Sequence, residues 1–139
     1  MKAQVKWLDN MSFVGESDSG HSVVMDGPPD DGGRNMGVRP MEMVLLGMGG
    51  CTAFDVIHIL KKARQNVVDC RIELDAKRAE TVPKVFTDIH LKYFVIGKDL
   101  DEKKVARAVT MTADKYCSVS IMLSKAVNIT HETIIQEVD

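Results

Sequence analysis

The feature that most constrains the fold is an apolar segment at residues 39–65, RPMEMVLLGMGGCTAFDVIHILKKARQ. Pro40 stands where a first helical residue belongs, apolar residues continue at helical spacing, and basic residues occupy the last turns. The segment therefore predicts one helix of roughly 25 residues. Because little of it is polar, we expect burial nearly all round, which a small domain achieves best with a partner subunit.

Glycines 47, 49 and 50 precede Cys51 in the interior of this helix. A glycine there costs about 1 kcal/mol relative to alanine. It also flattens the helix, so that another backbone or a ligand can approach the thiol closely. Two interpretations stay open: a working thiol beside room for a ligand, or simple helix packing with Cys51 as a small core residue.

The rest of the chain predicts an α+β fold. The predicted strands are residues 3–8, 12–16, 21–25, 67–80 and 84–97, with a final strand or two in the tail. A long loop rich in Gly, Pro and Asp precedes the first helix, and a helix, a short interruption and a second helix start at Asp99. With 139 residues and 45% hydrophobic composition, residues 1–139 suit a single domain with mostly antiparallel sheet.

The two long strands carry predicted apolar faces. Their apolar sets are Val68, Cys70, Ile72 and Leu74 in one and Phe86, Ile89, Leu91 and Phe94 in the other. Cys70 is therefore expected to be a core residue.

Charge and composition exclude several classes of partner. A net charge of -2 gives no basic field for nucleic acid or anionic lipid. The N-terminus lacks the apolar core of a signal peptide, and no run approaches the roughly 18 apolar residues of a membrane helix, so we expect a cytoplasmic protein. The three cysteines lack a C-x-x-C pair and the histidines are scattered, so neither a metal site nor another cofactor is expected.

Cys117 lies in ADKYCSVS, where the second helical pattern restarts. A helix N-terminus lowers the pKa of a thiol, which raises its reactivity. Two cysteines far apart, each just ahead of or within an apolar helix, are typical of a peroxide-reactive pair: one thiolate becomes a sulfenic acid, and the other condenses with it.

Together, PMEMVLLGMGGC and ADKYCSVS resemble the two cysteine motifs of the OsmC/Ohr family of osmotically inducible and organic hydroperoxide resistance proteins, in particular its YhfA-like branch. The resemblance implies an OsmC-like fold in which mostly antiparallel sheets wrap two central helices of an intertwined homodimer. It also implies a thiol peroxidase for organic hydroperoxides, with Cys51 peroxidatic and Cys117 resolving. A lipoyl-type or other dithiol would then reduce the disulfide.

The sequence departs from the family where a glutamate follows the motif's proline, because that position is Met41. Glu42 is the neighbouring candidate, although nine residues from Cys51 it lies half a turn out of phase on an ideal helix. Arg34 and Arg39 are the candidates for the family's loop arginine. We take Glu42 and Arg39 as the predicted electrostatic partners of the thiols.

Asp55 and His58 follow Cys51 at i+4 and i+7, on one helical face. His58 is two turns from the thiol, which favours contacts with strands or solvent over an orienting role. Three functions remain: the peroxidase, a non-catalytic dimer that binds an apolar or thiol ligand beside the glycines, and other thiol or persulfide chemistry at Cys51.

Overall fold

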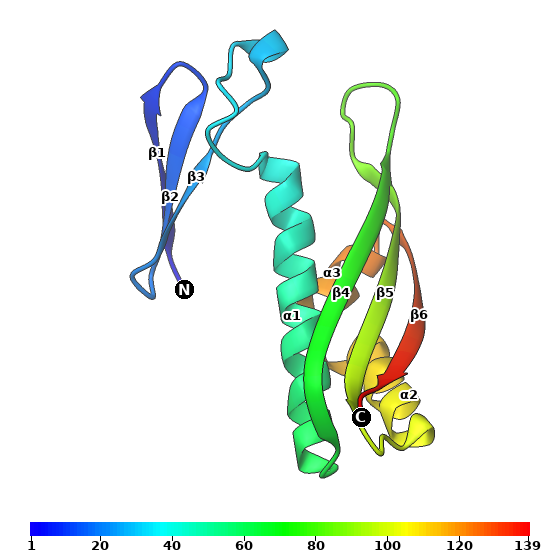
Figure 1. The fold of residues 1–139 in the computed structure, drawn as a ribbon. Helices are drawn as coiled ribbons and strands as arrows, with labels where there is room; N and C mark the ends of the chain where they lie inside the picture. The colour runs from blue at the N-terminus through cyan, green and yellow to red at the C-terminus, as the bar shows by residue number, and fades with distance from the viewer. The chain divides into compact units, whose positions relative to one another are not determined.

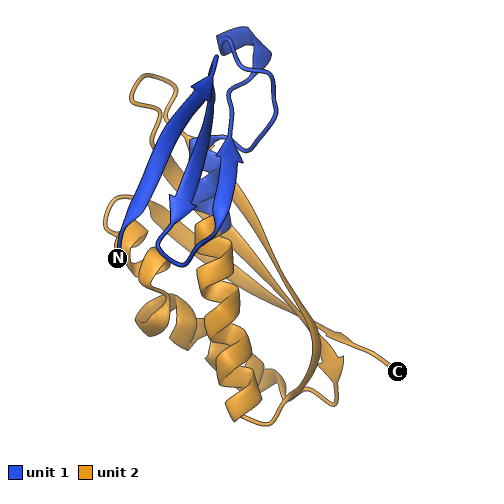
Figure 2. Cartoon of the chain, turned by 90° about the vertical axis from the view of Figure 1, so that its left-hand side faces the viewer, with its two compact units in different colours: residues 1–46 blue, residues 47–139 orange.

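The computed structural model describes residues 1–139 and confirms the α+β class (Figure 1). The elements are β1 (Ala3–Asp9), β2 (Ser12–Ser17), β3 (Ser22–Met25), η1 (Pro29–Asp31), α1 (Pro40–Lys62), β4 (Asn66–Arg78), β5 (Phe86–Lys98), α2 (Glu102–Met111), η2 (Thr112–Tyr116), α3 (Ser118–Ser124) and β6 (Asn128–Glu137). The chain divides into two compact units, residues 1–46 and 47–139 (Figure 2). Each unit is described by itself.

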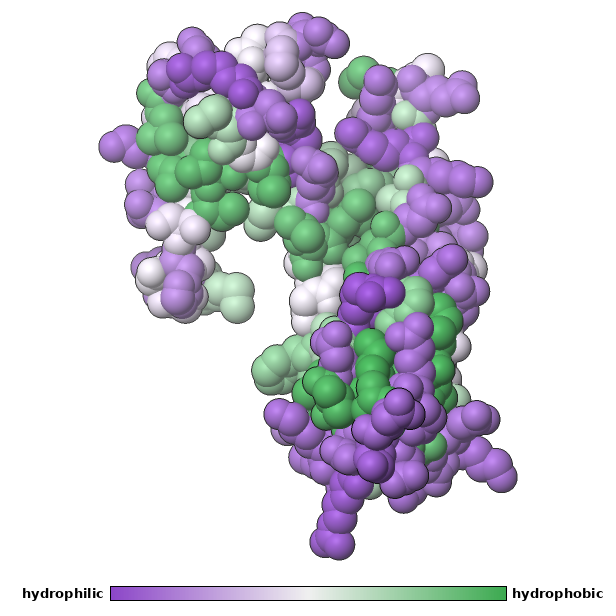
Figure 3. Space-filling view, viewed as in Figure 1, coloured by the Kyte–Doolittle hydropathy of each residue, from purple (hydrophilic) through white to green (hydrophobic).

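The first unit contains an antiparallel sheet in the order β1-β2-β3, followed by the loop and the start of α1. This is the predicted strand meander. Every residue of β1 is exposed, including Val5 at 62% and Trp7 at 64%. Figure 3 shows apolar side chains gathered over this sheet. The unit therefore presents an apolar surface that its own residues do not cover.

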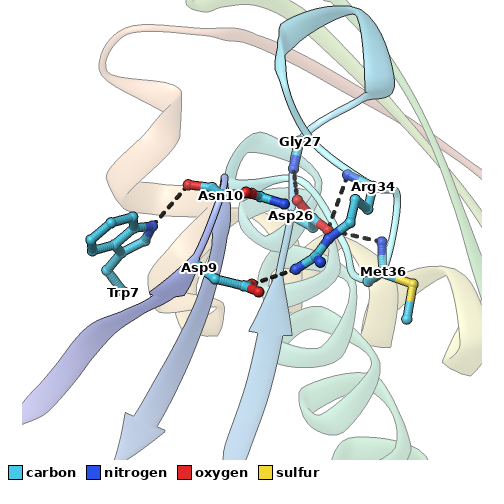
Figure 4. A network of polar contacts seen from close by, with 7 residues as sticks. All are labelled: Trp7, Asp9, Asn10, Asp26, Gly27, Arg34 and Met36. Atoms are coloured by element: carbon cyan, nitrogen blue, oxygen red, sulfur yellow. Dashed lines mark hydrogen bonds and ion pairs between the residues drawn. The ribbon is translucent and has the colours of Figure 1, made fainter.

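The carboxylate of Asp26 organises the loop that follows β3 (Figure 4). It accepts backbone hydrogen bonds from Gly27 at 2.8 Å, Met36 at 3.1 Å and Arg34 at 3.3 Å. The guanidinium of Arg34 pairs with Asp9. Burial alone would raise the pKa of Asp26, but the three N–H donors and the charge of Arg34 hold it below its ordinary value.

Acid should release this loop. Because the folded-state pKa of Asp26 is depressed, its stabilising contribution is present above the ordinary value of 3.8 and disappears as pH falls through the lower folded-state pKa. In an NMR titration, the amide signals of Gly27 and Met36 should move together with a midpoint below pH 3.8. Asp26→Asn should abolish this transition, and a midpoint above 3.8 would contradict the account.

The helix α1 begins and ends close to the predicted bounds, but one chain does not bury it all round. The buried residues form a single stripe: Met48, Gly49, Thr52, Val56 and Leu60. Leu46 and Phe54 are 57% and 73% exposed. A single chain therefore covers only one side of the helix, and the expected burial of the other side by a partner subunit stays a prediction.

By length and composition alone, α1 is also apolar enough to cross a bilayer. An 18-residue window has a mean hydropathy of 1.7, and 22% of that window is buried. The prediction that no run approaches a membrane span is wrong by this criterion, because the strongly apolar residues of α1 keep the mean hydropathy high although glycines and a threonine interrupt the run. Core helices of soluble proteins satisfy the same criterion, so α1 argues only weakly for a membrane.

The second unit contains a mixed sheet in the order β4-β5-β6. Strands β4 and β5 form a long antiparallel hairpin, and β6 pairs with β5 in parallel, so the tail forms one strand. The helix α1 packs against this sheet: a Cβ on Gly49 would lie 3.0 Å from Leu74 Cδ1 of β4. The hydroxyls of Thr52 and Tyr93 join α1 to β5 at 2.6 Å.

The predicted apolar faces of the two long strands were wrong at two residues, Phe94 and Val68. From Ile89 onward, the buried apolar residues of β5 alternate, as Ile89, Leu91, Tyr93 and Val95. Strand parity therefore puts Phe94 on the opposite face, where the guanidinium carbon of Arg71 lies 4.2 Å from its ring centroid. Val68 is the extra residue of a bulge between Val67 and Asp69 and is 64% exposed.

The predicted interruption between the last two helices is a π turn, η2. The backbone N–H of Cys117 donates to the carbonyl of Thr112 at 2.9 Å, closing a bond over five residues. Cys117 then caps α3. The π turn therefore sets the position of this cysteine.

Candidate thiol site

The structure brings the two cysteines of the sequence motifs together. The Sγ atoms of Cys51 and Cys117 and a carboxylate oxygen of Asp55 all lie within 4.8 Å of one another. Cys51 and Asp55 come from consecutive turns of α1, while Cys117 comes from the junction of η2 and α3. All three lie in the second unit, so the cluster forms within one compact body.

The two thiols have different surroundings. Cys51 is half-buried, whereas Cys117 is 0% exposed and its Sγ accepts the backbone N–H of Ser120 at 3.4 Å. Burial raises the pKa of Cys117, the bonds from Ser120 oppose that rise, and Cys51 adds to it. The prediction that the helix N-terminus lowers this pKa is therefore wrong, because desolvation outweighs the helix end. Burial therefore favours the protonated form of the Cys117 thiol.

A second buried polar pair lies one residue along from Cys51. Thr52 is 0% exposed and Tyr93 is 1% exposed, and their hydroxyls share the 2.6 Å hydrogen bond. Burial raises the pKa of Tyr93, and the nearby Cys117 and Cys70 contribute to that rise while Thr52 opposes it. The phenol therefore stays protonated and holds α1 against β5.

The energetic losses from removing the two members of this pair should not add. Tyr93→Phe or Thr52→Val leaves one buried hydroxyl without its partner, for which we expect a loss of about 1–3 kcal/mol in the free energy of unfolding. The double variant should cost less than the sum of the single variants. Urea unfolding of the four proteins measures the cycle, and additive losses would show that the bond contributes little.

A cavity of about 410 Å³ borders the thiol site at Asp55. It is lined by Asp55, His58, Ile59, Lys62, Met111 and Tyr116. Asp55 belongs both to this wall and to the sulfur cluster. His58 is exposed and stacks on Phe54, with ring centroids 6.2 Å apart, as the distance argument from sequence favoured. The cavity combines apolar walls with a cation at Lys62, so it suits a small, partly apolar molecule.

Known proteins share both the sequence and the fold. The sequence model of the OsmC-like protein family matches residues 31–132, which contain both motif cysteines. The chain belongs to the OsmC-like family. It is 53% identical to the protein YhfA of Escherichia coli over 131 residues, which cover 94% of this chain and 95% of YhfA.

Solved structures share the fold of this chain. A hypothetical protein from Aquifex aeolicus has a TM-score of 0.87 and 30% identity, over 99% of this chain and 97% of that one. An organic hydroperoxide resistance protein OsmC from Legionella pneumophila has a TM-score of 0.69 and 14% identity, over 96% of each chain. The latter shows a shared fold alone. The predicted OsmC-like fold and its YhfA-like branch are confirmed.

Glu42 and Arg39, the predicted electrostatic partners of the two thiols, lie in the first unit. Glu42 accepts the backbone N–H of Arg39 at 2.8 Å, three residues back, which is the glutamate half of a capping box at the start of α1. The guanidinium of Arg39 donates to Asn35 at 2.8 Å and to the carbonyl of Gly37 at 3.2 Å. Both side chains thus have structural partners, and their catalytic roles stay predictions.

The glycines of α1 were predicted either to pack the helix or to leave room for a ligand beside Cys51, and the structure contains both kinds. Gly49 serves packing against Leu74, whereas a Cβ on Gly47 or Gly50 would meet nothing within 4 Å. The open positions leave room beside the helix near Cys51. Cys70, predicted as core, is half-buried, and burial raises the pKa of its thiol.

Sequence reasoning missed the place of Asp55 in the cluster. Its spacing from Cys51 puts both on one helical face, but nothing in the sequence brings Cys117 to that face. The expected absence of a metal site rested on spacing between neighbouring ligands. Ligands that come from two elements far apart in the sequence leave no spacing pattern to recognise.

Proposed function

We propose that this OsmC-like protein is a thiol peroxidase that reduces organic hydroperoxides in defence against oxidative stress. The observation that carries the proposal is the convergence of the Cys51 and Cys117 sulfur atoms within 4.8 Å. The likeness in fold to a hydroperoxide resistance protein of Legionella pneumophila supports it. Residues 1–139 would act as a single domain of this kind.

The unequal surroundings of the thiols assign the roles. Half-buried Cys51 is the accessible sulfur, so its thiolate attacks the outer peroxide oxygen, forming a sulfenic acid and releasing the alcohol after protonation. Buried Cys117 then attacks that sulfur as its thiol proton departs, and water leaves as the disulfide forms. The sulfur atoms must close to about 2.05 Å for this bond. A lipoyl-type or other external dithiol would return both thiols.

The cavity supplies a place for the substrate. Ile59, Met111 and Tyr116 offer apolar and aromatic surface for the organic group of a hydroperoxide. Asp55 belongs to this wall, and its carboxylate lies within 4.8 Å of both sulfur atoms. If Glu42 and Arg39 serve only to cap α1, Asp55 would be the charged partner of the thiols instead.

The uncovered apolar surface supports a homodimer. Trp7 of β1 and Phe54 of α1 are 64% and 73% exposed, and Figure 3 shows further apolar side chains over both units. Large exposed apolar patches are uncommon on monomeric proteins and usually mark a surface that binds another protein. The expected protein is a cytoplasmic homodimer that binds neither nucleic acid nor membrane. Sedimentation equilibrium tests this state.

Intact mass of the denatured, thiol-blocked protein tests the chemistry after one equivalent of cumene hydroperoxide. The wild type should contain a disulfide between Cys51 and Cys117, identified by peptide mapping. Cys117→Ser should hold a sulfenic acid at Cys51, and Cys51→Ser should not react. Cys70→Ser, the matched control, should behave as the wild type. Three free thiols in the treated wild type would overturn the proposal.

The engagement of Glu42 in the helix cap, with Met41 in the family's glutamate position, favours a second candidate. In this alternative the protein is a non-catalytic dimer, and the cavity beside α1 holds an apolar or thiol-bearing ligand. An unreacted wild type in the peroxide experiment would turn attention to this function.

A further inference from the structure

We propose that Cys51, Asp55 and Cys117 form a zinc site with three protein ligands and one open position. Two thiolates and a carboxylate are a ligand set that zinc accepts, and thiolates disfavour magnesium and calcium. Three protein ligands with water in the fourth position are the arrangement of open zinc sites. This site does not depend on peroxidase activity.

The distances fit a small closure around the ion. With Zn–S bonds of about 2.3 Å and Zn–O bonds of about 2.1 Å, tetrahedral ligands lie roughly 3.6–3.8 Å apart. The three ligand atoms already lie within 4.8 Å of one another. About one ångström of movement therefore completes the site, which side-chain rotation can provide.

The local structure combines a fixed part with an adjustable part. Cys51 and Asp55 stand one turn apart on α1, whose stripe at Thr52 and Val56 is fully buried. Cys117 follows the π turn Thr112–Tyr116, a helical form less regular than the α-helix. A small change in this turn would bring Cys117 closer to the pair on α1. Asp55 also lines the 410 Å³ cavity, so its side of the site borders a space large enough for an ion and its water.

Zinc and the disulfide exclude each other, because both use the same two sulfur atoms. If the proposed peroxidase chemistry holds, zinc protects the thiols from the hydroperoxide. Oxidation of the site would consume one hydroperoxide and two protons and yield the disulfide, one alcohol, one water and free zinc.

Metal titration of the reduced, full-length protein tests the site. Zinc added in competition with a chromophoric zinc indicator should bind at one ion per chain. Cobalt should give thiolate-to-metal charge-transfer absorption and the intense visible bands of a tetrahedral ion. Cys51→Ser and Cys117→Ser should each weaken zinc binding at least about 100-fold, and Asp55→Asn about 10-fold or more. Cys70→Ser should bind as the wild type.

Differential alkylation gives an independent measure in the folded protein. Zinc should slow the reaction of Cys51 with iodoacetamide and leave that of Cys70 unchanged. The proposal fails if zinc does not bind, if Cys70→Ser weakens binding as much as Cys51→Ser, or if Asp55→Asn binds as tightly as the wild type. Zinc binding without disulfide formation by peroxide would support this site while overturning the proposed function.

Discussion

Cys51→Ser should lower the steady-state reduction of cumene hydroperoxide by at least about a thousand-fold. A serine hydroxyl is essentially un-ionised at neutral pH and is a far poorer nucleophile toward peroxide oxygen than a thiolate. The remaining thiol near the site, Cys117, is fully buried and its pKa is raised, so it cannot take over the attack. Consumption of the hydroperoxide, with a lipoyl-type dithiol as reductant, measures the loss.

The companion variants separate the two sulfur roles. Cys117→Ser should reduce one equivalent of hydroperoxide rapidly and then turn over slowly, because no disulfide forms for the dithiol to attack. Cys70→Ser should retain wild-type turnover, since that residue lies outside the sulfur cluster. Residual activity in Cys51→Ser above about a tenth of wild type would place the attacking thiol elsewhere.

Leu60→Ala should reduce the free energy of unfolding by about 2–5 kcal/mol. Leu60 is 0% exposed and lies in the buried stripe of α1 with Val56 and Met48. Truncating it removes apolar surface from the core and leaves a cavity that this packed helix cannot close. Urea unfolding monitored by circular dichroism measures the change.

Leu60→Met is the matched control for this experiment. It keeps the buried volume nearly constant and should cost less than about 1.5 kcal/mol. Equal losses for the two variants would indicate that the environment of Leu60 is not the close-packed stripe described for α1.

Local sequence patterns predicted most of the elements, because their causes are local. Pro40 and the helical spacing after it located α1, and alternation located both long strands. The errors arose where one residue changes the phase of a pattern. The bulge at Val68 moves that side chain out of the alternating set, and Phe94 falls on the wrong parity relative to Leu91.

The candidate site was only half predictable for a different reason. The motifs around Cys51 and Cys117 identified both thiols, and the helical spacing of Asp55 put it on the face of Cys51. Their convergence depends on how a turn of residues 112–117 meets the middle of α1, which is a tertiary contact. The pKa of Cys117 was misjudged because burial is also a tertiary property, and it outweighs the helix end.

The π turn at Thr112–Tyr116 has a consequence for how this chain tolerates insertions and deletions. A π turn holds one residue more than the equivalent α-helical turn, and each residue of an α-helix advances the chain by about 100° of rotation. Deleting one residue from this segment would let α2 run on as a regular helix. Cys117 would then rotate away from Cys51 by about a quarter of a turn or more. The extra residue thus sets the direction in which Cys117 points from the helix. A single-codon deletion here would separate the two thiols although all three cysteines are still present.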